Sequence, residues 1–195
     1  MSSDLRERRR RQTADDIQRA ALRLALRCGF EALTTEAIAA EAGVSPRTFF
    51  NYYANKQAAL LGRPPRMDAD EACWIVHSDA PLLDDLVALL TGLVEDGARL
   101  DRPKIRMVRQ VLDASPELEP LFHDMLEGNT RVLAGLLQQR LGMDAPAEAE
   151  LIAGLATGAL SHAVRDWASA DDLPAAEIKV LLRRRLQAVC RLLCA

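Results

Sequence analysis

The sequence comprises 195 residues, of which 49% are hydrophobic and 27% are charged, and its formal net charge is −3. A chain of this length and composition is typical of a soluble globular protein that can bury one sizeable core or two small ones. No apolar run reaches the roughly 18 residues that a membrane helix needs, and no apolar segment follows the N-terminal arginines as in a secretory signal, so we expect a cytoplasmic protein.

The chain begins with a strongly basic stretch. Five arginines, Arg6 and residues 8–11, fall within six positions, and almost nothing apolar accompanies them. We therefore predict a basic disordered arm over residues 1–12, which either contacts the DNA backbone or minor groove or is a solvated tail that aids solubility. Thr13 is the predicted cap of a first helix that runs to Gly29.

Charge is unevenly divided along the chain. Residues 1–56 hold ten Lys/Arg against seven Asp/Glu, whereas residues 57–195 hold fifteen against twenty-one. A basic end and an acidic remainder would orient the molecule near a polyanion, with the N-terminal part facing it.

Residues 34–56 predict two short helices joined by a tight turn. Their apolar positions fall on two helical stripes that are broken at Gly43, where glycine suits a positive φ. Thr34 or Thr35 can cap the first of these helices. Ser45 followed by Pro46 is a start signal for the second.

The second of these helices has the right size for the major groove of DNA, and its outward positions carry polar side chains. This stretch resembles the DNA-binding domain of TetR-family transcriptional repressors through Ile38-Ala39, Ala42-Gly43-Val44-Ser45, Thr48-Phe49-Phe50-Asn51-Tyr52-Tyr53 and Lys56. Phe50 is a departure, since many members of that family have a tyrosine there whose hydroxyl meets a phosphate. A small helical core whose aromatic side chains merely pack is the alternative. The DNA-contacting residues that we predict are Thr35, Ser45, Pro46, Arg47, Thr48, Asn51, Tyr52 and Lys56.

The next helix is predicted to be short, because Gly62-Arg63-Pro64-Pro65 should end it just after residue 61. It closes a helix-turn-helix DNA-binding domain over residues 13–61. In the TetR family the corresponding helix links the DNA-binding and ligand-binding parts and is usually longer. Asp68 and Glu71 then precede a short predicted helix over residues 72–76.

Five longer helical segments follow, and each has a proline near its first turn. Asp79, Ser115 and Asp144 are the predicted caps of three of them. No segment has the alternation of a β-strand, so we predict an all-α fold. By the resemblance, residues 66–195 form a helical ligand-binding and dimerisation domain. The predicted segments are 81–100, 103–114, 116–141, 146–168 and 174–193.

The last two segments carry a pattern typical of a subunit interface. Gly154 and Gly158 stand four residues apart on a face of small residues that would let another helix approach closely, in a second subunit or within the same one. In the TetR family the last two long helices of each subunit build a four-helix dimer interface. By that resemblance the interface residues are Leu151, Gly154, Leu155, Gly158, Ser161, Ile178, Leu182 and Val189.

The middle segments, from 81 to 141, would in this family enclose a small-molecule pocket. For each candidate residue, ordinary core packing or plain surface exposure is an equally open interpretation. The candidates are Trp74, Arg106, Met107, Arg109, Val111, Phe122, His123, Met125 and Leu126.

Nothing in the sequence predicts catalysis. It contains no convincing nucleophile with a base, no paired carboxylates and no cluster of metal ligands, and His77, His123 and His162 lie on three separate segments. We therefore predict no catalytic residue, no metal and no cofactor. The four cysteines have neither metal-ligand spacing nor the density of a disulfide framework, so we expect reduced, mostly packed thiols.

These patterns together predict a homodimeric transcriptional regulator that binds double-stranded DNA. Its expected action is that of a repressor released from a palindromic operator by a small-molecule effector. An activator, or a regulator without a ligand, is the alternative within DNA binding. A helical enzyme or an adaptor is the alternative from another class.

Overall fold

The structure, a computed structural model, describes residues 2–63, 65–97, 100–142 and 144–193, and all regular structure in these ranges is helical. The all-α prediction is therefore confirmed. The chain divides into two compact units. The first comprises Met1–Arg63 and Pro103–Phe122, and the second comprises Pro64–Arg102 and His123–Ala195.

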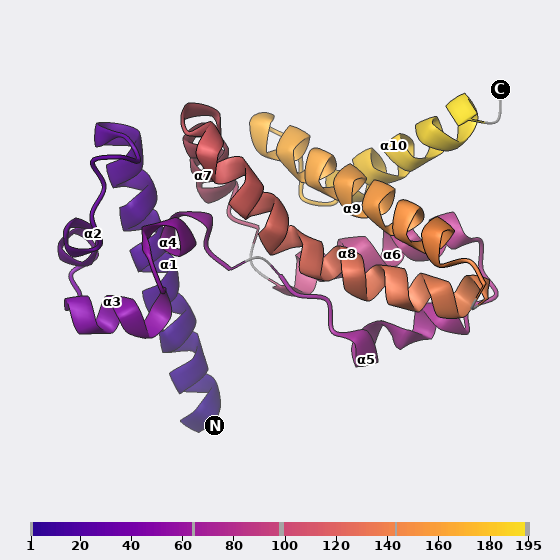
Figure 1. The fold of residues 1–195 in the computed structure, drawn as a ribbon, viewed down its shortest axis with the longest axis horizontal. Helices are drawn as coiled ribbons and strands as arrows, with labels where there is room; N and C mark the ends of the chain where they lie inside the picture. The colour runs from indigo at the N-terminus through magenta and orange to yellow at the C-terminus, as the bar shows by residue number, and fades with distance from the viewer. Residues whose placement is uncertain (1, 64, 98–99, 143, 194–195) are drawn as a thin grey trace. The chain divides into compact units, whose positions relative to one another are not determined.

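The first unit is built around a long N-terminal helix. Helix α1 (Ser2–Cys28) contacts α2 (Thr35–Glu41) and α4 (Lys56–Leu61), and α2 in turn contacts α3 (Pro46–Tyr52) (Figure 1). One fully buried apolar side chain from each of these helices fills the space between them, because burial of such side chains is the main stabilising term of a small domain. These are Ile17, Ile38, Phe49 and Leu60.

The prediction of a disordered arm is wrong, because α1 begins at Ser2. No glycine or proline interrupts the sequence up to Cys28, and arginine, glutamine and alanine are good helix formers. The later part of α1, from Ala14 on, packs in the core of this unit. The arginine-rich first turns therefore only extend a helix that is already formed. Thr13 is consequently not a cap: it lies inside α1, and its hydroxyl donates to the carbonyl of Arg9 at 3.0 Å.

The caps of the two short helices follow the prediction. The Thr34 hydroxyl accepts from the backbone N–H of Ala37 at 3.1 Å, and the Ser45 hydroxyl accepts from that of Thr48 at 3.0 Å. Gly43, between the helices, has a φ of +69°. The turn between α2 and α3 is therefore fixed by local chemistry.

Helix α4 is as short as predicted, with six residues. It ends at Gly62, whose φ is +74°. A Cβ at Gly62 would lie 2.1 Å from the side chain of Gln18, which is buried and donates to the carbonyl of Leu60. Both the backbone conformation and the close approach of α1 therefore require glycine here.

The first unit also includes a later helix. Helix α7 (Arg102–Ala114) joins this unit from Pro103 on, followed by the short η2 (Pro116–Leu118). An ion pair of 2.9 Å between Lys104 and Asp15 links α7 to α1. The sequence predicts a single boundary between residues 61 and 66, whereas the structure returns to the first unit at α7.

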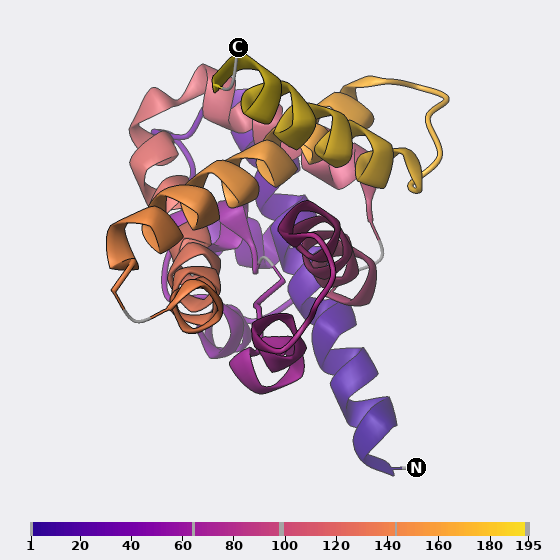
Figure 2. The ribbon, with the colours of Figure 1, turned by 90° about the vertical axis from the view of Figure 1, so that its right-hand side faces the viewer.

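The second unit contains α5 (Ala69–Ala72), η1 (Cys73–Val76), α6 (Leu82–Gly97), most of α8 (Glu119–Leu141), α9 (Pro146–Ser169) and α10 (Glu177–Leu193). Helix α10 lies beside α9 and also contacts α6 (Figure 2). The described part of α6 ends at Gly97, and residues 98–99 of the predicted segment 81–100 lie outside the described residues. The core of this unit includes Ile75, Leu90, Leu133, Leu137, Ala153 and Leu182.

A nearly buried ion pair fixes the start of α6. The guanidinium of Arg140 lies 2.5 Å from the Asp85 carboxylate and donates to the carbonyls of Ile75 and Ala80. Since the guanidinium has a carboxylate partner as well as these carbonyls, its buried charge is compensated. The loop between η1 and α6 is thereby attached to the end of α8.

Three smaller predictions need correction. Asp144 does not cap α9, because the residue at the cap position is Ala145, and Ser115 stands at the start of η2 without a side-chain cap bond. The cysteines are not packed: Cys28, Cys73 and Cys190 are free thiols on the surface, and Cys194 lies outside the described residues. In the part of the chain that the structure describes, no helix is long and apolar enough to cross a membrane.

Candidate nucleic-acid interface

The candidate DNA-reading surface is the outer face of α3. The helix is anchored by Phe49, which is fully buried, while Arg47, Phe50 and Asn51 are exposed. Positions three and four apart lie on the same face of a helix, so these three exposed side chains project together. Pro46, at the first helical position, extends this exposed face towards the start of the helix.

The chemistry of this face matches the edges of base pairs. Arginine offers a planar fork of donors and asparagine offers one donor and one acceptor group. A guanidinium can bond to guanine in the major groove, and a side-chain amide to adenine. Among the described residues, neither Arg47 nor Asn51 has a side-chain partner that would have to be released first.

Phe50 is an apolar part of this face that the predicted DNA-contacting set leaves out. Its ring is 54% exposed and stands edge-on to that of Phe49, with 5.2 Å between the ring centroids. The sequence alone could have placed Phe50 on this face, because it is three residues from Arg47 and residues three apart share one side of a helix.

Three other predicted contact residues are engaged by the fold itself. The ammonium of Lys56 donates to the carbonyls of Phe30 and Glu31 and lies 4.4 Å from the centroid of the Phe30 ring. The hydroxyls of Ser45 and Thr48 are 2.9 Å apart at the start of α3. Of its three N–H groups, Lys56 keeps one for a further acceptor. The hydroxyls of Ser45 and Thr48 thus fix the start of α3, and Lys56 attaches α4 to the turn after α1.

The remaining two predicted residues lie at the edges of this surface. Thr35 is half-buried and its hydroxyl donates to the Glu36 carboxylate at 3.1 Å, and Tyr52 is half-buried at the end of α3. Neither stands on the exposed face that Arg47 and Asn51 share.

Helix α2 is held against α1 by an acidic residue near its end. Glu41 accepts from Arg23 and Arg27, both at 3.3 Å. The hydrogen bond from Arg23, with a further one from Arg27, holds the pKa of the Glu41 carboxyl below its usual value. These bonds help to fix the position of α2, which carries α3 through the turn.

The predicted ligand-binding residues are divided between the two units. Trp74 is exposed, and the guanidinium of Arg109 pairs with Asp113 and Glu119. Of the nine candidates, Val111 alone lines either of the two cavities described below. Within the described ranges, no three His, Cys, Asp or Glu side chains gather closely enough to hold a metal ion.

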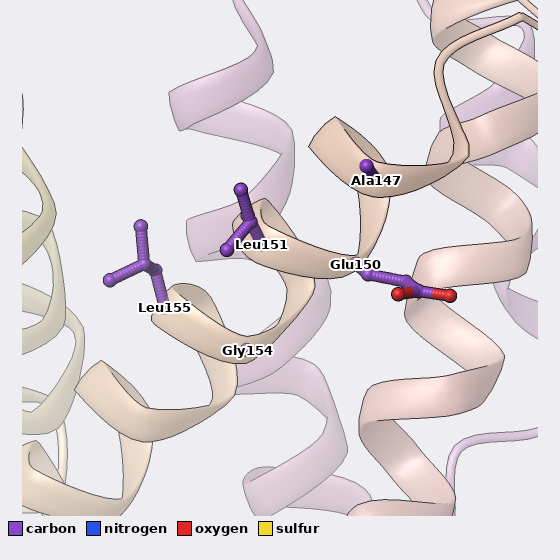
Figure 3. A pocket seen from close by; sticks show the side chains of 5 residues that line it. All are labelled: Ala147, Glu150, Leu151, Gly154 and Leu155. Atoms are coloured by element: carbon purple, nitrogen blue, oxygen red, sulfur yellow. The ribbon is translucent and has the colours of Figure 1, made fainter.

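The predicted interface residues separate into two groups. On α9, Leu151 is 68% exposed and Leu155 is 50% exposed, and both project from one side of the helix beside Gly154 (Figure 3). They line an open hollow of about 570 Å³ together with Ala147 and Glu150. Gly158 and Ser161 continue along α9, half-buried and exposed respectively. This face of α9 is apolar and uncovered within a single chain.

On α10 the predicted interface residues do not form an exposed surface. Ile178 and Leu182 are buried within the chain itself, because this side of α10 packs on α9 and α6, so their assignment to the interface is wrong. Val189 is half-buried. Among the described side chains of α10, the large apolar ones that are exposed are Val180 and Leu192.

Comparisons with known proteins agree with this architecture. Residues 17–61 match the model of the bacterial regulatory proteins of the tetR family. The HTH-type transcriptional regulator TcmR of Streptomyces glaucescens is 44% identical over 88 residues, which are 45% of this chain and 38% of TcmR. The matched region therefore spans well under half of TcmR.

A solved structure extends the likeness to the rest of the fold. It is that of a TetR-family transcriptional regulator from Mesorhizobium loti MAFF303099, and it aligns over 92% of this chain and 96% of that chain, with a TM-score of 0.50 and 16% identity. At this identity the similarity concerns the fold alone.

Proposed function

We propose that this chain, whose residues 17–61 match the model of the tetR family of bacterial regulatory proteins, represses transcription by binding a palindromic DNA operator with one helix α3 from each of two subunits. The observation that carries this proposal is the face of α3 on which Arg47, Phe50 and Asn51 are exposed together. Such a face presents hydrogen-bonding groups and one apolar ring together, which is the mixture that the edges of base pairs offer in the major groove.

In the proposed complex each exposed side chain has a distinct role. Arg47 donates both arms of its fork to one guanine, and Asn51 bonds to adenine. The ring of Phe50 lacks the hydroxyl that would reach a phosphate, and an apolar ring of this kind can instead contact a thymine methyl group. Lys56 uses its remaining N–H for a phosphate.

Two subunits are needed because one short helix reads too few base pairs to select a single locus. We propose that the exposed face of α9, with Leu151, Gly154, Leu155 and Gly158, forms the dimer contact. Val180 and Leu192 of α10 add apolar surface that a partner subunit can cover. In a symmetric dimer each of these residues contributes twice.

Release by a small molecule is the proposed means of regulation. The candidate contacts remain the residues of α7 and α8 named from the sequence, such as Met107, Phe122 and Met125. A constitutive regulator or an activator would share the same DNA surface, so the effector is tested separately from DNA binding.

The proposal is tested by selecting binding sites from a pool of random DNA duplexes and measuring affinity by mobility shift. We expect enrichment of a palindrome. On the selected operator, Arg47→Ala should weaken binding by about 1–3 kcal/mol and relax the preference at one position of each half-site.

The control is Arg131→Ala, which removes an exposed arginine of α8 in the second unit and should leave affinity unchanged. If no sequence is enriched, the proposed function is wrong. Equal affinity and preference for Arg47→Ala would remove Arg47 from the reading set.

A further inference from the structure

A second cavity lies within the first unit, at the end of α1. Its volume is about 360 Å³, and it is lined by the last turns of α1 on one side and by the end of α7 and η2 on the other. All of its lining residues belong to the first unit. The volume falls within the range of small-molecule sites in proteins.

The body of this cavity is apolar. Ala25, Leu26 and Phe30 line it from α1 and the turn that follows, and Val111 and Ala114 line it from α7. Gly29 lines it with backbone alone, and a Cβ at this position would meet no atom within 4 Å. An aromatic or aliphatic group can therefore enter against bare backbone.

The polar groups of the cavity are a hydroxyl and two carboxylates. Ser115 lines it with only 7% of its surface exposed, and its hydroxyl bonds to no other described residue. Glu31 and Glu117 also line it, and among the described residues neither carboxylate has an ion-pair partner. The Ser115 hydroxyl can therefore bond to a ligand in the cavity.

Among the described residues, no lysine or arginine lines the cavity. The nearby cations have other partners: Lys56 donates to the carbonyls of Phe30 and Glu31, and Arg109 pairs with Asp113 and Glu119. The lining residues thus carry two negative charges, and the Lys56 ammonium beside the wall, whose partners are uncharged carbonyls, adds one positive charge. This charge distribution selects against anions and in favour of cations.

We propose that the cavity between the end of α1 and α7 binds an organic cation with a compact apolar body. The apolar part would lie against Leu26 and Val111, because the Phe30 ring already has the Lys56 ammonium 4.4 Å from its centroid. The charged part would face Glu31 and Glu117, and Ser115 would accept or donate one hydrogen bond. Binding itself does not depend on the proposed DNA function, although any effect of the cation on the operator would rest on it.

The site is tested by titrating the full-length protein with benzyltrimethylammonium in a calorimeter, without DNA. We expect one site per chain. Phenylacetate, an anion of similar size, should not bind. The double variant Glu31→Gln/Glu117→Gln should lower the affinity for the cation about tenfold or more, because both attractive charges are removed.

Two further variants separate this result from general effects. Glu71→Gln/Glu127→Gln removes two exposed carboxylates of the second unit and should leave the affinity unchanged. Ala114→Phe should fill the cavity and abolish binding while the helical circular dichroism persists. The proposal is overturned if benzyltrimethylammonium does not bind, if phenylacetate binds equally well, or if the Glu31/Glu117 variant binds as the native chain does. Since no DNA is present, none of these results bears on the proposed regulator function.

Discussion

Tyr53 is the residue whose ionisation reports most directly on the core beneath α3. Its hydroxyl donates to the carbonyl of Ala14 at 3.1 Å, and burial raises its pKa to about 12 from the ordinary 10. Because the folded state favours the protonated phenol, this residue's contribution to stability is complete below pH 10 and is lost as the pH rises towards 12. In the variant Tyr52→Phe, Tyr53 is the sole tyrosine, and we expect its phenolate absorbance to titrate near pH 12.

The hydrogen bond can be measured independently of this titration. Tyr53→Phe should lower the free energy of unfolding by about 0.5–1.5 kcal/mol in urea at neutral pH, since it removes one buried hydrogen bond. Titration of Tyr53 at its ordinary value in the folded protein would contradict this account of its burial.

At the residue scale, the sequence predicts best where a role depends on neighbours in the chain. Thr34, Ser45 and Gly43 act on groups within a few residues, so their types and spacing sufficed. Ile178 and Leu182 could not be placed, because an apolar stripe on a helix does not reveal whether its own chain or a second chain covers it. The contacts of Lys56 could not be predicted either, since its partners lie 25 and 26 residues away along the chain.

At the scale of the element, the helical N-terminus changes how the arginines can act. The exposed residues Arg6, Arg8, Arg9 and Arg10 belong to α1, so their side chains project from a helix whose later turns pack in the first unit. Replacing all four by glutamine preserves helix propensity and removes the charges. We expect the slope of log affinity against log salt concentration to become shallower by about 0.9 for each phosphate that the arginines neutralise in the native complex.

The control for this experiment is Arg131→Gln/Arg184→Gln, which removes exposed arginines from the second unit. Its salt slope should equal that of the native protein. If the slope of the four-arginine variant is also unchanged, the basic part of α1 does not touch DNA.

Sequence patterns predict where a helix ends but not which helices pack together. The short α4 was predictable from Gly62 and the prolines after it, because helix ends are set locally. The association of α7 with α1 was not, because the ion pair of Lys104 and Asp15 joins positions 89 residues apart. The cavity at the end of α1 is lined by both α1 and α7, so it also depends on their association, and no sequence motif could predict it.

At the scale of the whole molecule, recognition requires two copies of α3 in one particle. A dimer meets this need when its reading helices stand about 34–36 Å apart, or near a multiple of that distance, so that both enter major grooves on one side of the DNA. The apolar face of α9 is the surface that we assign to this contact. Its assignment can be tested without disturbing the fold of the subunit.

Gly158→Leu is the decisive substitution for that test. A Cβ at Gly158 meets no atom within 4 Å in the single chain, so the added side chain begins in open space. Replacing a glycine inside α9 should even favour the helix. At a close helix contact, overpacking costs about 1–3 kcal/mol, and symmetry applies this cost at both subunits. We therefore expect the variant to sediment as a monomer and to lose operator binding while its helical circular dichroism persists.

Gly128→Leu on α8, which also has no atom within 4 Å of the added Cβ, is the matched control and should stay dimeric. A Gly158→Leu protein that remains dimeric and binds the operator normally would place the dimer contact away from this face of α9.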